Sequence, residues 1–495
     1  MADYIKIHPN DNVVIALKDF NPGDHIIVED NLIEIVSEIP KGHKIALRSL
    51  EKDSNIIKYG APIGHALQSI QVGEHVHVQN LKTNLSGTIS YSFNQKLNEL
   101  RYSQRDFTFE GYKRSNGKVG IRNELWIVPT VGCVNGQAQQ IADLFKNEVA
   151  PTDIDAIEVF KHSFGCSQLG DDHVNTQKAL ADVINHPNSG GVFVLGLGCE
   201  NNQIDQLKTF IGEYDQSRVR FLVAQDVEDE VEAGLEIMKE IYETMRYDQR
   251  ETVPLSELRV GLKCGGSDGF SGITANPMVG AFSDFLVAQG GTTILTEVPE
   301  MFGAETLLME RAQNNEVFDK TVSLINDFKD YYLQHNLPVY ENPSPGNKKG
   351  GITTLEDKSL GCTQKGGSAT VVDVLKYAEP IKKRGLNLLS APGNDLVAAS
   401  ALGFSGCQMV LFTTGRGTPF GSFVPTMKIS TNSDLYNKKR NWIDFNAGTL
   451  LEGKTMDGLL DEFIQFVIDV ASGKLLNHEK SGFKEIAIFK TGVTL

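Results

Sequence analysis

The stretch that decides the fold runs from Leu262 to Pro277 and reads Leu-Lys-Cys-Gly-Gly-Ser-Asp-Gly-Phe-Ser-Gly-Ile-Thr-Ala-Asn-Pro. An apolar, strand-like run over 258–262 leads into it, and an apolar, helix-like segment over 278–289 follows it. Its glycines alternate with polar side chains, and glycine allows close approach of the backbone to a neighbouring group. The stretch therefore predicts a strand-to-helix loop wrapped around a small ligand. It lacks the GxGxxG spacing of a dinucleotide site.

Length and charge limit what the whole chain can be. Its 495 residues, 40% hydrophobic and 22% charged, fit a globular protein of about two to four domains. A net charge of −16 argues against nucleic acid and anionic membranes as partners, because these are bound by clustered Lys and Arg. No apolar run approaches the roughly 20 residues of a membrane span, and the N-terminus lacks the features of a signal peptide. We expect a cytoplasmic protein that acts on a small-molecule substrate and has neither nucleic acid nor a membrane as a partner. The sequence is compatible with a homodimer.

Residues 1–83 are predicted to form a small all-β domain. Short apolar runs at 13–15, 25–28, 32–36 and 44–47 are separated by turn residues. His75 and His77 are two positions apart in a strand-like run, so both side chains point to one face. Paired imidazoles suit a divalent transition metal, and His43 and His65 are nearby in the sequence. We predict His75 and His77 as metal ligands, although two solvent-facing histidines of an edge strand would show the same pattern.

The rest of the chain is predicted to form two further domains. Residues 84–107 lack strong periodicity and are interpreted as a linker. Over 108–250, strand-like runs alternate with helix-like segments, which predicts a mostly parallel sheet covered by helices. A second α/β domain over 256–495 begins with the quoted stretch, and its Pro- and Gly-rich segment 341–358 is predicted to be a lid or binding loop. The fold class is therefore α/β, with a small β domain followed by two α/β domains with mostly parallel sheets.

Reactive side chains follow several predicted strands, where ligands of parallel sheets bind. Cys166, Cys199 and Cys264 each lie in a polar loop that contains glycine, so we predict them as further metal ligands. Small buried cysteines are also common. The chain has no CxxC pair, which argues against a zinc knuckle or a thioredoxin motif.

The same loops supply candidates for catalysis and for substrate binding. His173, His162, Glu297 and Glu300 are the candidate bases, although both glutamates could instead cap a helix. Arg416 suits a substrate carboxylate, because guanidinium binds carboxylate through two parallel hydrogen bonds. The remaining predicted substrate ligands are Ser267, Asp268, Asn276 and Asn394. This set fits metal-assisted removal of water from a hydroxy acid, in which a base takes a proton next to a carboxylate.

Several motifs resemble those of one known family. They are Gly111–Asn123, Gly165–His173, Cys264–Gly269, Asn342–Lys348 and Thr413–Pro419. These motifs resemble the altronate/galactarate dehydratase family over essentially the full chain. Residues 42–47, 57–60 and 73–77 are likewise similar to the SAF domain of that family, a small β-clip module. Gly73–His77, Gly165–His173 and Phe489–Leu495 are most similar to its altronate branch. The resemblance implies dehydration of D-altronate to 2-dehydro-3-deoxy-D-gluconate in hexuronate (galacturonate) breakdown, with Fe²⁺ or Mn²⁺ as the metal.

Three alternatives stay open at this point. An iron–sulfur hydro-lyase would hold a cluster through Cys166, Cys199 and Cys264, although clustered spacing is more usual for such ligands. A relative acting on galactarate or on a sulfolactate-type acid would share the same motifs. A sugar-acid-binding protein without catalytic activity would keep the SAF domain and turn over no aldonate.

Overall fold

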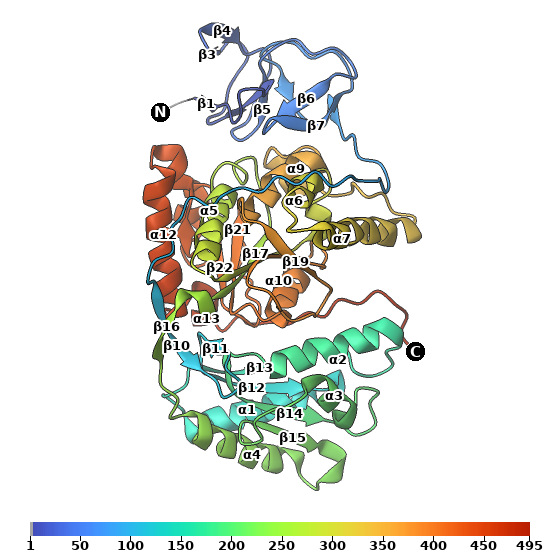
Figure 1. The fold of residues 1–495 in the computed structure, drawn as a ribbon, viewed down its shortest axis with the longest axis vertical. Coiled ribbons are helices and arrows are strands. Elements are labelled where there is room, and N and C mark those ends of the chain that lie inside the picture. Colours follow the sequence, from blue (N-terminus) through green and yellow to red (C-terminus); the bar gives the residue numbers. More distant parts are fainter. Residues whose placement is uncertain (1–2) are drawn as a thin grey trace.

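The computed structural model describes residues 3–495 and shows three bodies stacked along the long axis of the molecule (Figure 1). The N-terminal β domain lies at one end, the largest α/β domain in the middle, and the smaller α/β domain at the other end. Both α/β domains contain a parallel sheet. The predicted fold class is therefore confirmed.

Short antiparallel strands build the N-terminal domain, in sheets of order β1-β2-β5-β8, β3-β4 and β6-β7-β9. The strands are β1 (Tyr4–Ile5), β2 (Val13–Ala16), β3 (His25–Val28), β4 (Asn31–Glu34), β5 (Lys44–Ala46), β6 (Asn55–Lys58), β7 (Ala61–Ala66), β8 (His75–Val76) and β9 (Leu81–Lys82). One of its two apolar clusters also contains Ala304 and Leu360 from the largest domain. The small domain therefore completes its core against its neighbour, as expected of a module too small to bury enough surface alone.

Residues 84–107 contain no helix or strand and run along the surface of the largest domain (Figure 1). Tyr91, Phe93 and Phe107 pack on the core of that domain, and the Lys96 amide donates to the Glu310 carbonyl at 2.7 Å. The linker is thus held against the domain that it crosses.

The smaller α/β domain has a parallel sheet of order β13-β12-β14-β15. Its strands are β12 (Glu124–Pro129), β13 (Ala156–Val159), β14 (Ser189–Gly196) and β15 (Val219–Val223), and its helices are α1 (Asn135–Val149), α2 (Gly170–Ile184), α3 (Ile204–Ile211) and α4 (Glu230–Met245). Every residue of β12 and β14 is buried, which explains their continuous apolar character. A separate antiparallel sheet joins β10 (Thr108–Lys113), β11 (Val119–Gly120) and β16 (Glu251–Pro254), so residues 251–254 form a strand that the sequence did not predict.

The largest domain has a seven-stranded parallel sheet of order β19-β20-β18-β17-β21-β22-β23. Its strands are β17 (Arg259–Cys264), β18 (Thr292–Leu295), β19 (Val371–Leu375), β20 (Gly385–Leu389), β21 (Met409–Thr414), β22 (Thr426–Ser430) and β23 (Phe445–Asn446). Its helices are α5 (Ala275–Ala288), α6 (Glu305–Met309), α7 (Asn315–Gln334), α8 (Pro345–Lys349), α9 (Leu355–Cys362), α10 (Asp395–Phe404), α11 (Ser433–Lys438), α12 (Met456–Ala471) and α13 (Asn477–Lys480). The Leu262–Pro277 stretch joins β17, at the centre of this sheet, to α5.

The segment 341–358 differs from the predicted irregular loop because it contains α8 and the start of α9. Ser344 and Thr354 cap the two helices, their hydroxyls accepting from the amides of Asn347 and Asp357. Pro345 follows the first cap at a position where its missing N–H costs nothing. These helices lie beside the N-terminal domain (Figure 1).

Within residues 3–495, no helix has both the length and the apolar character needed to cross a bilayer.

Candidate active site

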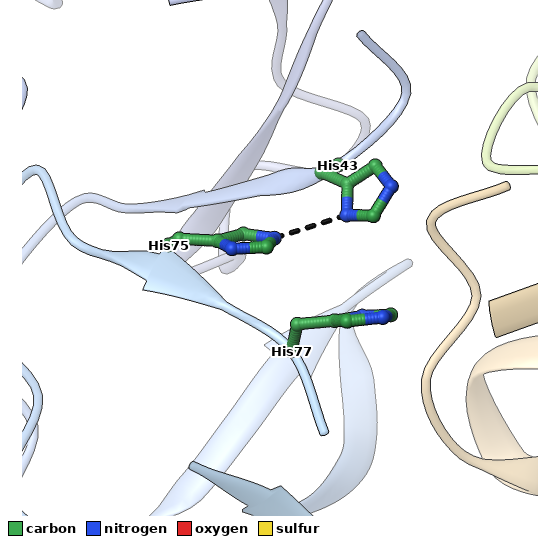
Figure 2. Close-up of side chains that lie close together, drawn as sticks. All are labelled: His43, His75 and His77. Carbon is green, nitrogen blue, oxygen red and sulfur yellow. Dashed lines mark hydrogen bonds between the residues drawn. The ribbon is translucent and has the colours of Figure 1, made fainter. Parts of the chain in front are cut away.

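Three imidazoles meet where the N-terminal domain faces α8 and α9. His43 directly precedes β5, and β5 pairs with β8 so that Ile45 lies opposite His75. His43 Nδ1 and His75 Nε2 are 3.0 Å apart, and one nitrogen from each of His43, His75 and His77 lies within 4.8 Å of the others (Figure 2). The two predicted ligands are therefore joined by a third histidine from the neighbouring strand.

This histidine cluster is chemically suited to a transition metal. Burial lowers the pKa of His43. Burial, together with the charges of His43 and Lys44, lowers the pKa of His75 to about 4 and that of His77 to about 3. Metals bind the neutral imidazole, so all three rings are held in the form that binds. Imidazole donors favour Fe²⁺ over the oxygen-preferring Mn²⁺.

The α8–α9 segment closes one side of the cluster. His43 Nε2 lies 3.3 Å from the Lys349 carbonyl oxygen, and His77 Nδ1 lies 3.2 Å from Thr353 Oγ1. Such contacts outside a ligand set fix ring orientation and tautomer. The histidine cluster thus depends on docking of the N-terminal domain onto the largest domain.

A second donor set lies buried in the largest domain. Cys264 Sγ donates to Glu300 Oε2 at 3.0 Å, Cys362 Sγ lies 3.3 Å from the same oxygen, and the two sulfurs are 3.3 Å apart. Lys358 Nζ lies 2.6 Å from the other Glu300 oxygen. Since the Lys358 ammonium already neutralises this carboxylate, the histidine cluster fits a metal better than this set does.

Glu297 and Glu300 lie side by side with opposite electrostatic bias. Burial and the neighbouring charge of Glu300 raise the pKa of Glu297, even though Lys263 and Lys365 lie 3.1 and 3.3 Å from its oxygens. Burial opposes ionisation of Glu300, but the ammonium groups of Lys358 and Lys365 outweigh it and lower its pKa to about 2. Two carboxyl groups whose pKa values are pushed apart can serve as proton donor and proton acceptor. Glu297 makes no side-chain capping hydrogen bond, contrary to the alternative that it caps a helix.

The glycine loop within Leu262–Pro277 packs between the N-terminal domain and α8. The Gly269 amide donates to the Gly350 carbonyl at 2.7 Å. A Cβ added at Gly269 would lie 2.1 Å from the Gly42 carbonyl oxygen, so only glycine allows this approach. The segment Gly265–Gly269 also has the GxSxG spacing of a nucleophile elbow, but Ser267 is only 1% exposed and the left-handed φ of 62° lies at Gly266.

The predicted substrate ligands occupy different environments. Asp268 is buried, and its oxygens accept from Ser271, Phe270, Thr431 and Asn432. Asn276 donates to the Gly361 carbonyl and accepts from Thr413, and Asn394 caps α10. These three side chains therefore have structural partners. Ser267 Oγ is buried without a partner among the described residues, and Arg416 is exposed beside Gly266.

The predicted residues of the smaller α/β domain do not join this site. His162 is buried, its Nδ1 accepts from the Phe164 amide at 3.2 Å, and its Nε2 lies 2.8 Å from the Pro129 carbonyl oxygen. His173 lies in the first turn of α2. Cys166 and Cys199 are exposed beyond β13 and β14, whereas Cys264 is buried at the end of β17 in another sheet. The structure therefore does not bring the predicted cysteine trio together, and it places Cys362 beside Cys264 instead.

Comparison with known proteins places these features in a family. Family models match the chain in three consecutive parts: the altronate/galactarate dehydratase SAF domain over residues 2–84, the D-galactarate dehydratase/altronate hydrolase second domain over 111–246, and the D-galactarate/altronate dehydratase C-terminal domain over 255–494. An altronate dehydratase of Bacillus subtilis (strain 168) is 60% identical over 100% of both chains. The chain belongs to the altronate/galactarate dehydratase family. The resemblance predicted from its motifs is therefore confirmed.

Two further relatives show where the chain lies within the altronate/galactarate dehydratases. An altronate dehydratase of Escherichia coli (strain K12) is 55% identical over 99% of this chain and 100% of its own. A galactarate dehydratase (L-threo-forming) of the same organism is 35% identical over 96% of this chain and 93% of its own. The two altronate dehydratases are thus more similar to the chain than the galactarate dehydratase is.

Proposed function

We propose that this chain is a hydro-lyase that converts D-altronate to 2-dehydro-3-deoxy-D-gluconate and water, in cytoplasmic breakdown of hexuronates. The observation that carries the proposal is full-length identity of 60% and 55% to two altronate dehydratases, against 35% to a galactarate dehydratase. The reaction removes the proton on C2 and the hydroxyl on C3. The enol that results becomes the 2-keto product.

We propose that His43, His75 and His77 hold Fe²⁺, with Mn²⁺ as the substitute. When bound, the ion would act as a Lewis acid on an oxygen of the substrate. The supporting observations are the three nitrogens within 4.8 Å of one another and the lowered pKa values of the rings.

The proposed roles of the other residues follow from charge and exposure. Glu300 is held ionised by Lys358 at 2.6 Å, so it is assigned as the proton acceptor. Glu297 has a raised pKa and is assigned to protonate the leaving hydroxide. Arg416 is exposed at the carboxyl end of β21, so it is assigned to the substrate carboxylate.

A panel of sugar acids tests the activity. D-altronate, galactarate and other aldonates are incubated with Fe²⁺, Mn²⁺, Mg²⁺ or a chelator, and the 2-keto-3-deoxy product is measured. We expect altronate to be dehydrated fastest with Fe²⁺, and chelator to stop the reaction. Faster turnover of galactarate would favour the galactarate alternative, and no turnover of any acid with any metal would refute the proposal.

Histidine variants test the metal assignment separately from turnover. Fe²⁺ affinity is measured by anaerobic equilibrium dialysis for His77→Ala and for His25→Ala, an exposed histidine of β3. We expect affinity to fall at least about tenfold in His77→Ala, since even residues outside the ligand set cost that much. Equal affinity in both variants would remove the histidine cluster as the metal site.

A further inference from the structure

Three exposed cysteines lie at one edge of the parallel sheet in the smaller α/β domain. Cys133, Cys166 and Cys199 follow β12, β13 and β14, and these strands are neighbours in the order β13-β12-β14. Since the strands are parallel, their carboxyl ends share one edge. Cysteine is among the residues most often buried, as Cys407 is here, so three exposed cysteines on adjacent loops call for a chemical explanation.

Backbone hydrogen bonds tie the three loops to one another. The amide of Gly132, next to Cys133, donates to the Phe164 carbonyl at 3.0 Å. The amide of Asn202 donates to the carbonyl of Gly165, next to Cys166, also at 3.0 Å. The Ser167 amide donates to Asn201 Oδ1 at 2.8 Å. Each cysteine therefore extends from a loop that is anchored directly to its neighbour.

Close backbone contact packs this frame tightly. A Cβ added at Gly165 would lie 2.1 Å from the Thr130 carbonyl oxygen, and one added at Gly132 would lie 2.8 Å from the His162 carbonyl oxygen. The end of the chain also docks here, since the Leu495 amide donates to the Ser167 carbonyl at 3.0 Å. A preformed frame is what a bound inorganic group requires of its ligands.

Polar atoms without partners lie in one of these loops, at Asn202, and in the first turns of α1 and α2, at Asn135 and His173. Asn202 is fully buried, and its Oδ1 has no hydrogen-bond partner among the described residues. Asn135 Oδ1, two positions after Cys133, and His173 Nδ1 are buried atoms in the same condition. Buried polar atoms are normally satisfied, so each unsatisfied one points to a missing partner.

A single metal ion does not fit the three sulfurs. Thiolates at about 2.3 Å from one zinc ion lie at most about 4.6 Å apart. In the described part of the chain, the sets with three ligand atoms within 4.8 Å of one another are the histidine cluster and the Cys264, Glu300 and Cys362 set, and the three exposed cysteines are absent from both. An iron–sulfur cluster is wider than one ion and is held by thiolates that stand farther apart.

We propose that Cys133, Cys166 and Cys199 bind an iron–sulfur cluster of the [4Fe–4S] class, with one iron left free of cysteine. That iron takes a ligand other than cysteine, such as a small oxygen donor. The site differs from the trio expected from the sequence, because Cys133 takes the place of Cys264. It lies in a different domain from the histidine cluster and does not rest on the proposed function.

The test uses the full chain, reconstituted anaerobically with Fe²⁺ and sulfide. Beyond the ion at the histidine cluster, we expect about four iron and about four acid-labile sulfide per chain, with the broad visible absorption of thiolate-bound clusters. The triple variant Cys133→Ser, Cys166→Ser, Cys199→Ser is expected to lose both sulfide and absorption. Cys407→Ala, in a buried core position, is the matched control and is expected to keep them.

Two further measurements keep the outcomes distinct. Thermal unfolding of the triple variant is expected to match that of the apoprotein, because the three side chains are exposed. Fe²⁺ binding at the histidine cluster, measured without sulfide, is expected to be unchanged. Equal acid-labile sulfide in the wild type and the folded triple variant, or a reconstituted wild type that holds iron but no acid-labile sulfide, would overturn the proposal whether or not altronate is dehydrated.

Discussion

Asp357→Asn tests how the N-terminal domain is held on the largest domain. Asp357 Oδ2 lies 2.8 Å from Lys44 Nζ, and its Oδ1 lies 2.9 Å from Lys58 Nζ. The exposed fractions of the three side chains are 0–2%. Burial opposes ionisation of Asp357, but the two ammonium groups outweigh it and hold its pKa well below the usual range. Both lysines come from the small domain, so this carboxylate at the start of α9 joins the two domains.

The size of the effect follows from what the amide leaves behind. Asparagine keeps the shape of the side chain but removes the charge, so two buried ammonium groups remain without a counter-ion. Removing one partner of a buried ion pair costs about 3–5 kcal/mol. A loss of that size lowers the docking equilibrium constant roughly a hundred- to a few-thousand-fold.

Hydrogen exchange of β5, β6 and α9, with limited proteolysis at residues 84–107, measures the docking. We expect both to speed up strongly in Asp357→Asn. Asp434→Asn is the matched control, because the Lys41–Asp434 pair joins the same two domains at 2.8 Å with exposed fractions of 41% and 81%. Pairs that exposed contribute about 0–1 kcal/mol. Similar exchange in the two variants would refute the argument that the buried triad holds the domain.

Three other predictions follow from buried groups elsewhere. Arg122 forms a two-fold ion pair with Glu479 at 2.8 Å and donates to three carbonyls. We expect Arg122→Lys to lower the free energy of unfolding by about 2–4 kcal/mol, measured by chemical unfolding with the exposed Arg220→Lys as the control. An equal loss in both variants would contradict this prediction. Burial lowers the pKa of His186 and of His478 to about 3. Below about pH 6.5 the unfolded chain therefore binds protons that these histidines do not bind in the folded protein, so the free energy of unfolding should fall as pH drops from 6.5 towards 3. His478→Asn should make this pH dependence less steep. An unchanged pH dependence in His478→Asn would contradict the prediction. In Gly165→Ala the new Cβ would lie 2.1 Å from a carbonyl oxygen at a φ of 98°, whereas in Gly117→Ala, at a φ of 77°, it meets nothing within 4 Å. We expect the melting temperature to fall much further in Gly165→Ala than in Gly117→Ala. Equal shifts in melting temperature would show that the contact at Gly165 is not tight.

Local pattern predicted most of the architecture because strands and helices are set by nearby residues. The buried run that became β12 and the amphipathic segment that became α1 are examples. The β16 strand was missed because three of its four residues are exposed and it is defined by its pairing with β10. In segment 341–358, Pro and Gly suggested an irregular loop, but capping by Ser344 and Thr354 allows short helices.

The candidate site was predicted only in part. The two-residue spacing of His75 and His77 predicted a shared face, so the sequence could pair them, although β8 itself ends at Val76. His43 joins them through strand pairing over more than thirty positions, and no local pattern reports such a contact. For the same reason the sequence did not pair Cys264 with Cys362, which are 98 positions apart in the chain. The prediction instead grouped Cys264 with Cys166 and Cys199, which belong to another domain.

The sequence by itself determined the three-part α/β organisation, the family, and the loops in which reactive side chains lie, because periodicity, turn residues and motifs are local properties of the chain. Only the tertiary structure decided which of those side chains meet. The glycine loop at Leu262–Pro277 packs against Gly42 and Gly350, and its Cys264 faces Glu300 and Cys362. Convergence of this kind depends on strand order and domain docking, and both are set by burial of surface between segments far apart in the chain.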